Sequence, residues 1–132
     1  MSGPDWDIDR GWGEEGQDVV KALSRYNIEV KRKRRLDDKI YVELEQDPGA
    51  TGTRWKPSGL RTTQAEYWAF VVGETGVVMF FPAGLLRWAI YERQGGVDIA
   101  EIDGDNPTRG RLLRVPWLVQ VSGEWLAMVG RL

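Results

Sequence analysis

The chain has 132 residues, which is the size of one ordinary domain with a single hydrophobic core. It contains no Cys and no His, which excludes thiol nucleophiles, disulfides, imidazole-based proton transfer and Cys/His zinc sites. With 18 Lys and Arg residues against 20 Asp and Glu residues the net charge is −2, so a nucleic-acid partner would have to be held by a local basic patch.

The N-terminal segment MSGPDWDIDR is acidic and polar, whereas a signal peptide would be basic and then apolar. No apolar run approaches the roughly 18 residues that cross a bilayer. We therefore expect a cytoplasmic protein with no membrane partner.

The first third of the chain predicts an arm, a helix and two strands. Residues 1–11 lack periodicity and predict an irregular N-terminal arm, and residues 12–132 are predicted to form a single domain. Apolar residues recur at helical spacing from Glu14 to Tyr26, which predicts an amphipathic helix. Apolar and polar residues then alternate in YNIEVKRKR and in IYVELEQ, which predicts two strands joined by a short turn.

The remainder predicts a loop, two buried strands and a second helix. Residues 46–61 are rich in Gly, Pro and Thr and predict a long loop of the kind that is functional or disordered in small domains. TTQAEYWAFVV predicts a helical turn and then a buried strand, VVMFFP a second strand, and AGLLRWAIYERQ a helix. Residues 95–110 are loop-like, and residues 111–132 fit helix or strand. Together these elements predict an α/β domain with a mixed central β-sheet flanked by helices.

A hairpin centred on Asp37 would gather acidic side chains on one face. In that register Glu29 pairs with Glu45 and Lys31 pairs with Glu43, and cross-strand neighbours lie about 5 Å apart. Three carboxylates so close favour a divalent cation, and Mg²⁺, with Mn²⁺ as a substitute, prefers oxygen ligands. The same alternation is also typical of a solvated sheet face with cross-strand ion pairs.

Glu15 adds a fourth carboxylate on the apolar stripe of the predicted helix. It either reaches water at the start of the helix, where it favours the helix dipole, or points into the same acidic cluster as a further metal ligand.

The order of a helical Glu, IEVK, a turn and VELE resembles the PD-(D/E)XK nuclease superfamily, particularly its small phage-type members. The string SGLRTTQAEYWAFVV strengthens the resemblance, which spans roughly Glu14 to Arg93. It implies a restriction-endonuclease-like fold and Mg²⁺-dependent hydrolysis of DNA, acting on branched, Holliday junction-like or other structured DNA. It also implies host cytoplasm as the location if the protein is encoded by a phage.

Two alignments with the superfamily are open. In the first, Glu29-Val30-Lys31 is the acidic-x-Lys triplet and Asp18 is the upstream acid. In the second, Glu29 is the first acid and Glu43-Leu44-Glu45 replaces the triplet, with Glu where Lys is usual and Lys31 beside the cluster. The second uses the hairpin geometry and is preferred. It assigns catalysis to Glu29, Lys31, Glu43 and Glu45, and metal binding to those three glutamates and Glu15.

Five consecutive cations, Lys31 to Arg35, lie next to the proposed site. On this interpretation they hold DNA phosphates, with Arg32, Lys33, Arg34 and Arg35 as the assigned contacts. The long loop adds Lys56, Ser58, Arg61 and Thr62, with Trp55 able to stack on a base. A charge run is equally typical of a solvated turn.

An enzyme of this size that cuts both strands would be expected to act as a homodimer. The alternative function is a catalytically inactive nucleic-acid or protein binding module on the same fold.

Overall fold

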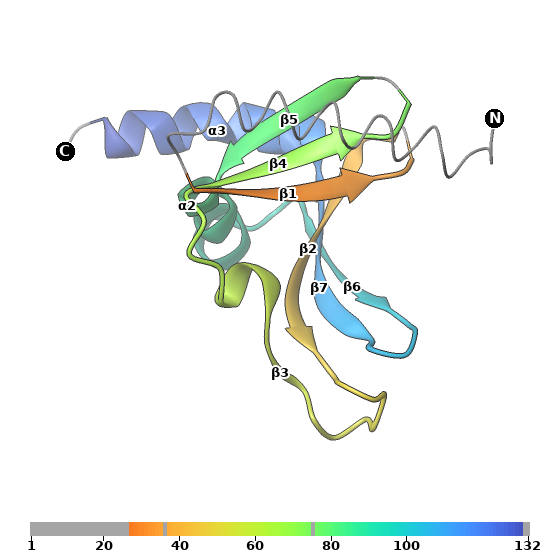
Figure 1. Cartoon of the computed structure of the whole chain (residues 1–132). Helices are drawn as coiled ribbons and strands as arrows, with labels where there is room; N and C mark the ends of the chain where they lie inside the picture. The colour runs from red at the N-terminus through yellow and green to blue at the C-terminus, as the bar shows by residue number, and fades with distance from the viewer. Residues whose placement is uncertain (1–26, 36, 75, 131–132) are drawn as a thin grey trace. The chain divides into compact units, whose positions relative to one another are not determined.

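The computed structural model describes residues 27–35, 37–74 and 76–130 (Figure 1). The predicted arm and first helix, and with them Glu15 and Asp18, lie outside the described residues. The chain forms two compact units, each built from two separate stretches. The first unit comprises Met1–Asp37 and Gln64–Ala83, and the second comprises Asp38–Thr63 and Gly84–Leu132. The α/β class predicted from the sequence is confirmed, because each unit contains a sheet and the chain adds helices.

The first unit contains a three-stranded mixed sheet in the order β1-β4-β5. β1 (Ile28–Lys33) runs parallel to β4 (Tyr67–Val72), which pairs antiparallel with β5 (Val77–Pro82). β4 is central because its sequence YWAFVV is apolar throughout, and such a strand gains most when it has neighbours on both edges and cover on both faces. Trp68 and Ala69 accordingly have 0% of their surface exposed.

The second unit contains a four-stranded antiparallel sheet in the order β3-β2-β7-β6. Its strands are β2 (Lys39–Gln46), β3 (Lys56–Pro57), β6 (Val97–Ile102) and β7 (Thr108–Arg114). The predicted alternation of β2 is confirmed, since Ile40, Val42 and Leu44 are 1%, 0% and 4% exposed and the residues between them are half-buried.

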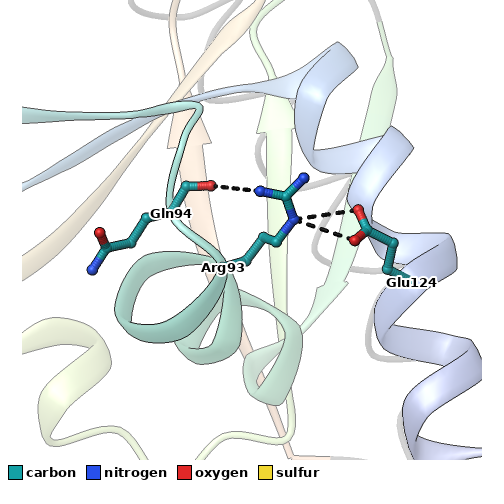
Figure 2. Close-up of polar contacts among 3 residues, drawn as sticks. All are labelled: Arg93, Gln94 and Glu124. Carbon is teal, nitrogen blue, oxygen red and sulfur yellow. Dashed lines mark hydrogen bonds and ion pairs between the residues drawn. The ribbon is translucent and has the colours of Figure 1, made fainter.

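The helices are α2 (Ala83–Trp88), which continues as the π-helical segment η2 (Ala89–Arg93), α3 (Val115–Val129) and the single turn η1 (Gly59–Arg61). α2 and η2 cover the helix predicted for AGLLRWAIYERQ. The end of η2 is tied to α3: Arg93 Nε donates to the two carboxylate oxygens of Glu124 at 3.3 and 3.4 Å, and Arg93 Nη1 donates to the Gln94 carbonyl at 3.4 Å (Figure 2). No helix among the described residues is long and apolar enough to cross a membrane.

The predicted hairpin is wrong. β1 and β2 are both strands, as expected, but β1 pairs with β4 in one sheet, whereas β2 pairs with β3 and β7 in the other. The cross-strand pairs expected for Glu29 with Glu45 and for Lys31 with Glu43 therefore do not form. The physical reason is that the buried strand β4 takes β1 as its parallel neighbour.

Residues 95–110, predicted as loop, contain β6 and the start of β7. The sequence did not decide between helix and strand for the segment after residue 110. In the structure this segment completes β7 and then forms α3. Pro116 lies in the first turn of α3, where its missing N–H costs no hydrogen bond.

Candidate nucleic-acid and metal site

Glu29 and Lys31 are two residues apart in β1, so their side chains leave the same face of the strand. Lys31 Nζ lies 2.7 Å from Glu29 Oε2, and the two side chains are 37% and 32% exposed. The same ammonium lies 5.1 Å from the ring centroid of Trp68 in β4, where the face of the indole attracts a cation. The carboxylate and the indole together fix the ammonium of Lys31 at a half-exposed position.

The basic run that begins at Lys31 divides into two sets. Lys33 Nζ donates to the Asp37 carboxylate, and the Lys33 side chain is only 10% exposed. The arginines of the run are exposed residues: Arg32, Arg34 and Arg35. The charge of Lys33 is thus offset within the unit.

Glu43 and Glu45 lie in β2 of the second unit. Glu45 Oε2 is 3.6 Å from Arg61 Nη1, and its side chain is 32% exposed. The pairing of β2 with β7 shifts register between Glu43 and Glu45, so Leu44 occupies an irregularity in the ladder. Glu29 and Lys31, in contrast, belong to the first unit. Among the residues that the structure describes, no group of three or more acidic side chains is close enough to share a metal ion.

The SGL motif within the long loop has a structural explanation. Gly59 has φ +55°, and a Cβ atom there would lie 2.2 Å from the Glu43 carbonyl oxygen. Only glycine permits both the left-handed backbone and the close approach to β2. Ser58 is buried at 6% exposure and its N–H donates to the Leu44 carbonyl at 2.9 Å. The Ser58 backbone thus fixes this part of the loop against β2.

The remaining predicted contacts of this loop are exposed: Lys56, Arg61 and Thr62. Trp55 is predicted to stack on a base. In the structure the guanidinium carbon of Arg109 lies 3.7 Å from the centroid of the Trp55 ring. That face of Trp55 is therefore occupied by a cation from β7.

Sequence reasoning missed Asp47, which organises the loop. Its side chain is 1% exposed and accepts hydrogen bonds from Thr51 Oγ1 at 2.7 Å, from the Gly52 N–H, and from the Arg54 N–H at 3.2 Å. Burial raises the pKa of the Asp47 carboxyl, but the hydrogen bonds outweigh it and hold the pKa below its ordinary value of 3.8. The signal in the sequence was Asp-Pro-Gly-Ala-Thr, because Asp side chains commonly bond the backbone of a following turn.

Asp47→Asn is expected to destabilise the protein at neutral pH. A depressed pKa means that the ionised carboxylate contributes stability above pH 3.8 and that this contribution is lost as the pH falls through the lower folded-state pKa. The stability difference between wild type and variant should therefore shrink below pH 3.8. Urea unfolding at pH 7 and under acid conditions measures it. Asp105→Asn, at an exposed position, serves as the control, and a difference that grows in acid would contradict the expectation.

No family model, no curated protein and no solved structure matches this chain.

Proposed function

We propose that this protein is a metal-dependent DNA endonuclease in which Glu29 and Lys31 act at the reacting phosphate. The observation that supports the proposal best is the contact between these two side chains on one face of β1, with the ammonium held over Trp68. Both alignments with the PD-(D/E)XK superfamily include Glu29, and the first makes Glu29-Val30-Lys31 the catalytic triplet.

The donor chemistry at Glu29 fits Mg²⁺ or Mn²⁺. Carboxylate oxygen is the ligand that Mg²⁺ prefers, and Mg²⁺ is commonly bound through one or two carboxylates, with waters and substrate phosphate oxygens completing the octahedron. When bound, the ion supplies an activated water and offsets the charge that develops on the phosphate. Glu29 would hold it.

The cations near Glu29 would bind the DNA backbone. Lys31, freed from Glu29 when that carboxylate takes an ion, would bind a phosphate oxygen or orient the attacking water. The exposed Arg32, Arg34 and Arg35 would contact neighbouring backbone phosphates, which position a nucleic acid without reading its sequence. A homodimer would present two such sites to a two-fold symmetric DNA junction.

The experiment incubates the full chain with supercoiled plasmid and with a synthetic four-way junction, in Mg²⁺, in Mn²⁺ and in excess chelator. We expect cleavage with either metal and none with chelator. Protein that circular dichroism shows to be folded, yet cuts no substrate with either metal, would overturn the proposal.

The second candidate function is a non-catalytic nucleic-acid binding module. It is favoured by the lack of a three-acid group among the described residues, together with the exposed arginines of β1 and the turn after it. In the same assay this module would retard DNA in a gel, with an affinity that falls as salt rises, and would leave the DNA intact.

A further inference from the structure

The second unit contains a pocket that has no part in the proposed nuclease chemistry. Its volume is about 360 Å³, and it is lined by Gly95, Gly96, Asp98, Arg114 and Trp117. Three of the five lining residues, Gly95, Asp98 and Arg114, are exposed, so the pocket is an open depression in the surface. The lining combines one carboxylate, one guanidinium, one indole and the bare backbone of two consecutive glycines.

Asp98 and Arg114 present opposite charges from one face of the sheet. Asp98 in β6 lies opposite Leu112 in β7, and Arg114 is two residues beyond Leu112 on the same strand. Asp98 and Arg114 are therefore diagonal neighbours, for which the usual separation is about 7–8 Å. In the described part of the chain neither side chain forms an ion pair or a hydrogen bond with another residue. The pocket thus offers an acceptor and a donor that the protein itself leaves unused.

The indole of Trp117 lies against the glycine backbone of the pocket. A Cβ atom on Gly96 would be 2.2 Å from Trp117 Cδ2, so the ring occupies the space that a side chain at position 96 would need. Gly95, with φ +102°, precedes this contact. The turn that leads into it is held by Arg93, which bonds the Gln94 carbonyl and the carboxylate of Glu124 in α3 (Figure 2). The Gly96 backbone therefore covers one face of the indole, and Trp117 as a whole is half-exposed.

We propose that this pocket binds a guanine nucleotide. A carboxylate only accepts hydrogen bonds, so the ligand must present N–H donors to Asp98, and guanine has two adjacent donors, N1–H and the N2 amino group. A guanidinium only donates, so the ligand must present acceptors to Arg114, and guanine O6 and N7 or a phosphate do so. The planar base stacks on the face of the Trp117 indole that Gly96 does not cover. α3 begins at Val115, directly after Arg114, so its positive end also favours a phosphate at this pocket.

This inference does not depend on the nuclease proposal, because all of its residues are in the second unit and none is assigned to phosphodiester hydrolysis. The same chemistry is presented by a free guanine nucleotide and by an unpaired guanine in single-stranded DNA. A binding measurement can separate the two sources.

Titration calorimetry on the full chain compares guanosine, adenosine and cytidine 5′-monophosphates, and oligo(dT) carrying one central dG or one central dA. We expect guanosine monophosphate to bind about tenfold or more tighter than adenosine monophosphate. If the dG oligonucleotide binds tighter than both the dA oligonucleotide and the guanosine mononucleotide, the source is nucleic acid. If the preference for guanine appears only among the mononucleotides, the source is the free nucleotide. Equal affinity for the guanine and adenine ligands, or no guanine binding at millimolar concentration, would overturn the proposal.

Asp98→Asn keeps the size of the side chain but replaces one acceptor with a donor, so it should remove the guanine preference. The matched control is Glu101→Gln, which removes the same charge from an exposed position on β6 outside the pocket and should leave the preference intact. Loss of the preference in Glu101→Gln, or its retention in Asp98→Asn, would contradict the assignment. Unfolding curves of both variants verify that each is folded.

Discussion

Glu29→Gln is expected to lower metal-dependent DNA cleavage by about 100-fold or more, because positioned electrostatic groups at a reacting centre commonly contribute that much. The amide has the shape of the carboxylate but carries no charge, so it would hold a divalent ion poorly. It would also remove the negative charge that now lies 2.7 Å from the Lys31 ammonium. Initial rates on the preferred DNA substrate, at saturating Mg²⁺ and across a Mn²⁺ titration, measure the loss.

The matched control is Glu66→Gln, which neutralises an exposed acid just before β4 in the same unit and should cleave at the wild-type rate. Glu43→Gln and Glu45→Gln distinguish the two alignments. A loss as large as that of Glu29→Gln would favour the alignment that uses Glu43-Leu44-Glu45. Cleavage by Glu29→Gln at the wild-type rate would remove Glu29 from the proposal.

Gly110→Ala is expected to lower the free energy of unfolding by about 3 kcal/mol, which is the upper part of the usual cost of overpacking. Gly110 in β7 is paired with Glu43 in β2, and a Cβ atom there would lie 2.1 Å from the Val42 carbonyl oxygen. Because the atom in conflict belongs to the backbone, no side-chain rotation relieves the overlap, and the two strands would have to separate. Urea unfolding followed by tryptophan fluorescence measures the change.

The same substitution at Gly123 should have the opposite sign. Gly123 lies within α3 and a Cβ atom there meets nothing within 4 Å, so Gly123→Ala should stabilise the protein by about 0.5–1 kcal/mol through helix propensity. If both variants destabilised equally, the close approach of β7 to β2 would not be the cause at Gly110.

The strands could be predicted from the sequence better than their partners. Alternation in β2 correctly placed Val42 and Leu44 in the core, because local periodicity alone decides which side chains of a strand are buried. The neighbour of β1 was decided by the burial demand of β4, a strand more than thirty residues further along the chain. The turn predicted near Asp37 does not reveal whether β1 pairs with β2 or with β4.

β6 and α3 were difficult to predict because several of their apolar side chains are exposed to solvent. Ile99 in β6 is 81% exposed, and Val119 and Leu126 in α3 are 59% and 58% exposed. Exposed apolar residues blur the period of an element, since the pattern is clear only when apolar side chains all face the core.

The candidate site could be predicted only in part. The Glu29–Lys31 contact follows from spacing within one strand and is present. The larger carboxylate cluster needed a hairpin that does not form. The pocket residues Asp98 and Trp117 gave no signal, because their meeting depends on the pairing of β6 with β7 and on the chain entering α3 directly after Arg114.

The division of the chain into interleaved units affects how the protein folds during synthesis and how one unit could be produced alone. The polypeptide passes from one unit to the other after Asp37, after Thr63 and after Ala83. On the ribosome β1 emerges first but must wait for β4, and β2 must wait for β7, so neither sheet can close until distant segments have been made. No single protease cut releases an intact unit. To obtain either one alone, its two stretches would have to be joined by a new linker.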